Sequence, residues 1–147
     1  MPDYDDPKIE KQWCLERRDE VTTYLKREHI VPGRIGDWPA WHIAPYLSIW
    51  AIESACQPER LGWWVICGDL PTDYVSAENI KHPRGAMLAF GKLWQEAASF
   101  MARGIPHPEF SIGNSKDWPI LARLLNSRAE ILLRWAEDEN LWDEEAL

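Results

Sequence analysis

The chain has 147 residues, a net charge of −8, ten tryptophans and three cysteines. A chain of this length can bury about 70% of the surface that it exposes when unfolded, so it needs neither metals nor disulfides to form a core. The cysteines form no CxxC pair, which argues against a disulfide scaffold and a zinc site. No basic stretch is apparent, so nucleic acid is not an expected partner.

The charge is concentrated near the end of the chain. Residues 136–147 hold six acidic side chains and no basic one, and are expected to form a frayed acidic tail of a single domain, 1–147. A run of about 18 apolar residues would indicate a membrane helix, and the sequence has none. Residues 1–25 also lack the pattern of a signal peptide. We therefore expect a cytoplasmic protein with no membrane partner.

The first expected element is a helix over residues 5–28. Asp5 or Asp6 can cap it, Pro7 suits its first turn, and apolar side chains recur at near-helical spacing. Residues 31–41 follow as a loop, because their prolines and glycines disfavour both a strand ladder and a helical turn.

Two strands are expected next, over residues 46–53 and 61–68, although periodicity alone does not distinguish the first from a short buried helix. The segment between them is short enough for an antiparallel hairpin. Residues 69–73 then predict a turn, and Tyr74 and Val75 a brief third strand.

Two long helices complete the expected elements. The first covers residues 83–103, with Gly104 at the position of a C-terminal cap, and the second covers residues 117–138. Together these elements predict an α+β fold, in which a small antiparallel sheet of two to three strands packs against three main helices.

The segment 68–84 holds the densest group of reactive side chains. Asp73 and His82 could form a base oriented by a carboxylate, and Arg84 could hold an anion. Turn and cap chemistry explains the same residue types, and we favour it: the aspartates can bond the backbone and His82 can cap a helix. Candidate binding residues in this segment are Asp69, Thr72 and Tyr74.

Tryptophans supply the second group of candidates. Trp38, Trp41 and His42, with Tyr46, could line a ligand pocket or form a protein contact, although core packing explains them as well. Trp142, within the acidic tail, could dock on a partner or back on its own domain.

Other sites have weaker signals. Trp63 and Trp64 would point to opposite faces of a strand, and one of them could be exposed. Cys67 could pair with His42 or His82 as a nucleophile, but any chain with several cysteines and histidines offers such a pairing. The four histidines lack metal-site spacing, and nucleotide-binding and hydrolase motifs are absent, so we expect no metal and no cofactor.

A long string of residues carries a family resemblance. Gly62-Trp63-Trp64-Val65 leads into Gly68-Asp69-Leu70-Pro71-Thr72-Asp73-Tyr74, followed by Lys81-His82-Pro83-Arg84. With this string the chain resembles an uncharacterised family of small bacterial proteins, a domain of unknown function. The resemblance runs over most of the chain and implies a small bacterial cytosolic protein, but it implies no activity and no catalytic residue.

Three hypotheses follow. The leading one is a non-enzymatic protein-binding module, an inhibitor or immunity-type partner of a basic protein, because the chain is small, acidic and rich in aromatic residues. The second is a small enzyme or ligand-binding domain with a pocket between residues 38–46 and 69–84. The third is a homodimer that joins through Trp63 or Trp64 and a sheet edge.

Overall fold

The computed structural model describes residues 2–110 and 112–142. Its contacts group the chain into two compact units, Met1–Ala86 and Met87–Leu147, which we call the N-terminal and C-terminal units and describe separately. Helices and an antiparallel sheet are both present, so the predicted α+β class is confirmed. The prediction of one domain over the whole chain stays a prediction.

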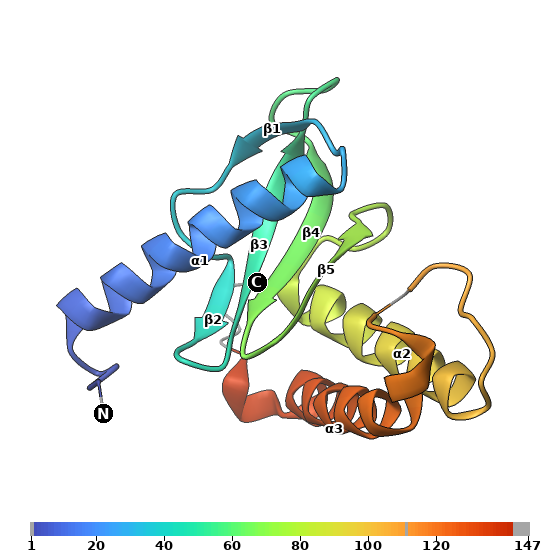
Figure 1. Ribbon diagram of the computed structural model, residues 1–147. Coiled ribbons are helices and arrows are strands. Elements are labelled where there is room, and N and C mark those ends of the chain that lie inside the picture. The colour runs from blue at the N-terminus through green and yellow to red at the C-terminus, as the bar shows by residue number, and fades with distance from the viewer. Residues whose placement is uncertain (1, 111, 143–147) are drawn as a thin grey trace. The chain divides into compact units, whose positions relative to one another are not determined.

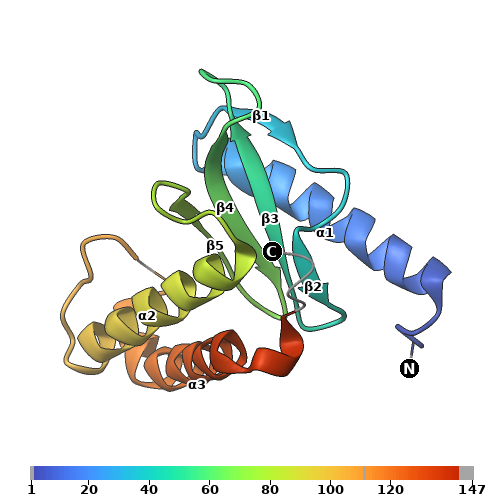
Figure 2. The ribbon, with the colours of Figure 1, turned by 180° about the vertical axis from the view of Figure 1, so that it is seen from behind.

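Helix α1 (Pro7–Arg27) opens the N-terminal unit, as the sequence predicted. The Asp6 side chain accepts a hydrogen bond from the Lys8 N–H at 2.9 Å, and Pro7 occupies the first helical position. Figure 1 shows α1 crossing one face of the sheet, in front of β3 and β4, and Figure 2 shows it behind the same strands. The helix therefore covers the middle of that face.

The sheet has five strands, which run antiparallel in the order β1-β3-β4-β5, with β2 also paired to β3. The predicted hairpin of the two central strands is confirmed, while the prediction of two to three strands is wrong. The bounds are β1 (Pro32–Ile35), β2 (Trp41–Ile43), β3 (Leu47–Ser54), β4 (Leu61–Gly68) and β5 (Leu70–Ser76).

Strands β1 and β2 lie in the segment that was expected to be a loop. Both pair only with β3, so their prolines and glycines do not interrupt the central ladder. Pro32 is the first residue of β1, a position where a missing N–H is tolerated. A Cβ at Gly33 would lie 2.7 Å from the Ser54 carbonyl oxygen, so glycine is what lets β1 approach β3.

Strand β5 replaces the turn expected over residues 69–73. Its polar residues suggested a turn, but β5 is the last strand on its side of the sheet, where polar side chains and Pro71 are acceptable. The turn between β4 and β5 is shorter than predicted and centres on Asp69, whose N–H donates to the Tyr46 carbonyl oxygen at 2.8 Å.

The core of the N-terminal unit forms between α1 and the two central strands. Its buried side chains are Val21, Tyr24 and Leu25 from the helix and Trp50, Ile52, Val65 and Cys67 from the sheet. Trp63 packs against this core. Trp64 points to the other face, where it is buried and its indole N–H donates to the Ile80 carbonyl oxygen at 2.9 Å. The predicted opposite orientation is confirmed, and neither tryptophan forms an exposed patch.

The C-terminal unit is built on two long helices that lie side by side in both views (Figures 1 and 2). Helix α2 (Pro83–Ala102) begins in the N-terminal unit, and α3 (Trp118–Glu137) follows the short helix η1 (Ser115–Asp117). Both predicted helices are confirmed. A Cβ at Gly91 would lie 2.8 Å from the Leu133 side chain, which shows how closely α2 and α3 approach.

The start of the acidic tail is structured. Helix α3 continues to Glu137, and a further short helix, η2 (Glu139–Leu141), leads to Trp142. The Trp142 side chain is buried, and its indole N–H donates to the Trp135 carbonyl oxygen at 2.9 Å. A frayed tail over residues 136–142 is therefore wrong, while residues 143–147 lie outside the described residues.

Within the described part of the chain, no helix is both long enough and apolar enough to span a bilayer.

The α1 core gives a direct stability test. Leu25 is fully buried and Leu15, on the same helix, is 44% exposed. We expect Leu25→Ala to lower the free energy of unfolding by about 2–5 kcal/mol, because it removes buried methyl groups and leaves a cavity. The matched change Leu15→Ala should cost less than about 1 kcal/mol. Urea unfolding followed by tryptophan fluorescence compares them, and equal losses would contradict the described core.

Candidate functional site

The structure places Asp73 in the middle of β5, opposite Ile66 of β4. The side chain is buried, and its Oδ1 accepts a hydrogen bond from the Tyr74 N–H at 2.8 Å. The backbone-bonding role that the sequence favoured for this aspartate is therefore confirmed, although a strand rather than a turn supplies the partner. Thr72 and Tyr74 flank Asp73 and, by the alternation of a strand, point to the opposite face.

His82 precedes α2 and caps it. Its Nδ1 accepts a hydrogen bond from the Arg84 N–H at 3.0 Å, so the predicted capping role is confirmed. Burial, and then the positive charge of Arg84, lower the pKa of His82. A neutral imidazole is what an acceptor at a helix start requires. The acid–base pairing of Asp73 with His82 stays a prediction.

Trp38 and His42, from the second predicted group, do lie together. The Trp38 ring stands edge-on to the His42 ring at 5.4 Å between centroids, and His42 stacks on Trp13 of α1 at 6.3 Å. The His42 Nε2 lies 3.2 Å from a Glu10 carboxylate oxygen. These four residues form a cluster at the contact of α1 with β2, which we call the Trp38 corner.

The other members of that group are Trp41 and Tyr46. Trp41 is next to His42 in β2, so its side chain leaves the other face of the strand, and it is half-buried. Tyr46 is 53% exposed beyond the end of β2. Sequence reasoning missed Glu10 and Trp13, because β2 was not predicted and nothing in the chain linked α1 to residue 42.

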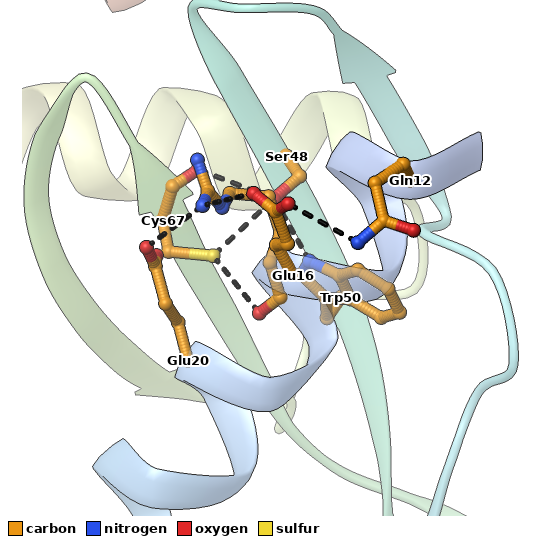
Figure 3. Close-up of polar contacts among 7 residues, drawn as sticks. Gln12, Glu16, Glu20, Ser48, Trp50 and Cys67 are labelled. Atoms are coloured by element: carbon orange, nitrogen blue, oxygen red, sulfur yellow. Dashed lines mark hydrogen bonds and ion pairs between the residues drawn. The ribbon is translucent and has the colours of Figure 1, made fainter. Parts of the chain in front are cut away.

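A buried polar row connects β3 and β4 beneath α1 (Figure 3). His42, Ser48 and Cys67 are direct partners across β2, β3 and β4, so they share one face of the sheet. The Ser48 hydroxyl accepts a hydrogen bond from the Trp50 indole at 2.8 Å and donates to the Cys67 carbonyl at 3.2 Å. The Cys67 thiol donates to the Arg17 carbonyl of α1 at 3.7 Å.

Burial excludes a nucleophilic role for Cys67 in this arrangement. It raises the pKa of the Cys67 thiol to about 12, although the hydrogen bond with Ser48 acts in the opposite direction. The reactive form of cysteine is the thiolate, and almost none is present near neutral pH. The thiol therefore serves as a hydrogen-bond donor to α1, and the pairing with His42 or His82 lacks support.

A groove of about 320 Å³ lies between α1 and β5 on the N-terminal unit. One stripe of α1 and a single residue of the edge strand line it: Glu16, Asp19, Glu20, Thr23, Tyr24, Arg27 and Thr72. We call it the α1–β5 groove. Thr72 is a predicted binding residue, whereas the sequence marked none of the α1 members as a candidate.

The C-terminal unit has a groove of its own, about 370 Å³ in volume, between α2 and α3. Small and polar side chains line most of it. In the same unit the buried His107 is fully engaged, because its Nε2 contacts Glu96 at 2.8 Å and its Nδ1 accepts from two backbone N–H groups. His107 therefore fixes the segment after α2 in place. Trp142, proposed as a partner anchor, is buried in this unit as described above.

No group of three or more histidine, cysteine, aspartate or glutamate side chains in the described ranges could hold a metal ion.

Comparison with known families decides what kind of chain this is. The model of the family described as a domain of unknown function (DUF4826) matches residues 8–142. The chain belongs to this family. The match spans nearly all of α1, the whole sheet, α2 and α3. No curated protein and no solved structure matches the chain.

The cap at α2 predicts a pH effect with a definite sign. Because the pKa of His82 is lowered in the folded chain, the unfolded chain binds the extra proton more readily, and stability falls as the pH drops below the ordinary histidine value of about 6.5. In His82→Asn, an amide oxygen replaces the ring nitrogen as the acceptor, and this group does not gain a proton in this pH range. We expect the variant to lose less stability than the unchanged chain between about pH 7 and pH 5. Urea unfolding measures both proteins at each pH. Equal losses of stability in the variant and the unchanged chain would contradict the capping role of His82.

The three thiols should differ in reactivity. Cys56 is exposed, whereas Cys14 and Cys67 are buried and burial raises their pKa values to about 11 and about 12. Iodoacetamide at about pH 8 is expected to alkylate Cys56 first and the other two only after denaturation. Peptide mass spectrometry reads each site. Rapid labelling of Cys67 in the folded chain would show that the thiol is accessible and reopen its role as a nucleophile.

Proposed function

We propose that the chain is a non-enzymatic protein-binding module whose contact surface is centred on Trp38. The observation that carries this proposal is a tryptophan that is 46% exposed and whose ring packs edge-on against His42. Tryptophan is among the residues that most often dominate binding energy in protein interfaces. An exposed tryptophan that the fold fixes in one place loses little freedom on binding.

The Trp38 corner supports the pre-organisation of this side chain. His42 is positioned by the Glu10 carboxylate and by its stack on Trp13, and Trp38 rests edge-on against it. Edge-to-face ring pairs contribute about 0.5–1.5 kcal/mol beyond the area that they bury. The indole therefore packs against a β2 residue that is itself held by contacts with α1.

The charge of the chain supports a basic partner. The net charge is −8, and Glu10 adds a carboxylate inside the Trp38 corner. Long-range attraction speeds the encounter of an acidic binder with a basic target. We propose that this partner is a basic protein of the same cytoplasm, such as a toxin or nuclease, and that the chain inhibits it in the manner of an immunity protein.

The described polar contacts favour a binding module over the alternative of an enzyme with a pocket between residues 38–46 and 69–84. Asp73 and His82 each accept a hydrogen bond from a neighbouring backbone N–H, and Cys67 is a buried thiol. The Asp73 and His82 side chains, suggested as the acid–base pair, thus each have a part in the fold. A catalytic pocket would need these groups to converge on a concave site.

Affinity capture tests the proposal. The intact chain is immobilised, a captured protein is identified by mass spectrometry, and its affinity is then measured with purified components. We expect Trp38→Ala to weaken binding by about 30-fold or more, the loss typical of a central interface tryptophan. Tyr46→Ala is the matched control, because Tyr46 is a similarly exposed aromatic residue, and it should weaken binding less than about threefold.

Two outcomes would contradict the proposal. One is a partner that binds the Trp38→Ala variant as tightly as the unchanged chain. The other is capture of no protein but a second copy of the chain, which light scattering would register as a dimer and which would support the homodimer hypothesis.

A further inference from the structure

Helix α3 carries a second apolar stripe besides the face that it buries. The buried residues lie on one face: Ala122, Leu125, Ala129, Leu132 and Ala136. At 3.6 residues per turn, a second set of apolar side chains lies on the opposite face, and we call it the outer stripe: Ile120, Leu124, Ile131 and Trp135. Ile120 is 59% exposed and Leu124, one turn later, is 56% exposed, while the other two are partly buried. Neighbouring large apolar side chains directed to solvent indicate a contact surface.

The charged side chains beside the outer stripe identify what the stripe fits. Four of them recur every seven residues, so they lie along one edge of the stripe: Lys116, Arg123, Glu130 and Glu137. Lys116 belongs to η1, directly before α3, and all four residues are exposed. The two cations come first and the two anions last. Read in the opposite direction, this edge is therefore its own electrostatic complement.

A second copy of the chain, with its α3 running antiparallel, matches this pattern. In an antiparallel pair of helices the same edges meet, so Arg123 of each copy faces Glu130 of the other. In that register Ile120 of each copy lies opposite Ile131 of the other, and the two Leu124 side chains lie near the middle of the contact. The arrangement has the two-fold symmetry of most protein dimers, because each residue pair occurs twice.

The same charges disfavour a parallel pair. In a parallel pair opposite edges meet, which would place Arg123 of one copy beside Arg128 of the other, and like charges across an interface are destabilising. Within its own chain the Arg123 guanidinium donates to the Pro119 carbonyl at 3.3 Å, and the Glu130 carboxylate accepts from the Asn126 amide at 3.1 Å. Neither of these partners is charged, so both side chains keep their charge for a contact with another molecule.

We infer that the chain forms an antiparallel homodimer through the outer stripe of α3. The stripes of the two copies bury each other, and the pairs of Arg123 with Glu130 fix the register. This contact differs from a dimer joined through the sheet edge, because Trp63 and Trp64 pack inside the N-terminal unit. The inference goes beyond the proposed function, since the dimer would present two copies of the Trp38 corner.

The oligomeric state of the full chain tests this inference. Sedimentation equilibrium over a range of concentrations gives the Kd of the dimer. We expect Leu124→Glu to weaken the dimer about 30-fold or more, because it places a carboxylate inside an apolar contact. Leu15→Glu is the matched control, since Leu15 is a 44% exposed leucine of α1, and it should leave the Kd unchanged. A monomeric mass up to about 100 μM, where even a dimer with a Kd of about 10 μM would be mostly formed, would overturn the inference.

Charge reversal tests the orientation of the helices. Arg123→Glu and Glu130→Arg should each weaken the dimer about tenfold, because each places like charges opposite one another. The double variant restores opposite charges and should recover most of the affinity. Lys92→Glu is the control, because it changes the net charge as Arg123→Glu does, at an exposed position of α2, and it should have no effect. Circular dichroism verifies the fold of each variant, and a double variant as weak as the single variants would overturn the inference.

This inference and the proposed function can fail separately. If the α3 variants dissociate a dimer but no other protein is captured, the dimer is real and the proposed function is wrong. If Leu124→Glu weakens capture of a different protein and leaves the mass of the chain unchanged, the outer stripe is a contact for that protein and the dimer inference is wrong.

Discussion

The packing of α1 against β3 and β4 is the contact on which the other features of the N-terminal unit depend. Val21 and Leu25 are fully buried against Trp50 and Val65, and each large apolar side chain buried in this way contributes about 1.5–3 kcal/mol. The apolar contact is not directional. The hydrogen bond from the Cys67 thiol to the Arg17 carbonyl adds direction, because it ties one point of the helix to one point of β4.

Both candidate sites lie along the edges of this helix. The first half of α1 supplies Glu10 and Trp13 to the Trp38 corner, where β2 provides His42. The second half supplies the acidic stripe of the α1–β5 groove. A shift of α1 along the sheet would separate the corner and change the groove at the same time. The Trp38 corner and the groove therefore share one structural support.

Several side chains of chemically reactive types make hydrogen bonds that stabilise this fold. Ser48 satisfies the Trp50 indole and the Cys67 carbonyl in the core, Asp73 bonds an amide in the edge strand, and His82 caps α2. Buried polar groups need partners, and these residues provide them. Reactive residue types are thus a weak sign of catalysis here. An exposed side chain that is not part of the core, such as Trp38, is a better sign of function than a buried residue of a reactive type.

The sequence predicted the elements whose signal is local. Asp6 and Pro7 predicted the start of α1, and the continuous apolar runs predicted β3 and β4. It did not predict β1, β2 or most of β5, because these strands depend on pairing with distant residues, and an edge position accepts the prolines and polar side chains that seemed to exclude strands. Intrinsic preference is a weak guide where such pairing decides.

The same reason limited prediction of the sites. Trp38 and His42 were identified from their residue types, but the contacts of His42 with Glu10 and Trp13 join segments about 30 positions apart. The α1–β5 groove was missed because each of its acidic residues resembles an ordinary solvated side chain until β5 is placed beside the helix. Trp142 is the opposite case, because its position among acidic residues suggested a binding residue. In the structure it packs within its own unit.

Site-specific photo-crosslinking tests the central claim most directly. A benzophenone amino acid replaces Trp38 in one variant and Leu124, an exposed residue of α3, in another, and each is irradiated in cells of the source organism. The account predicts a covalent adduct with a basic protein from position 38 and none with that protein from position 124. An adduct only from position 124, or none from either position, would contradict it.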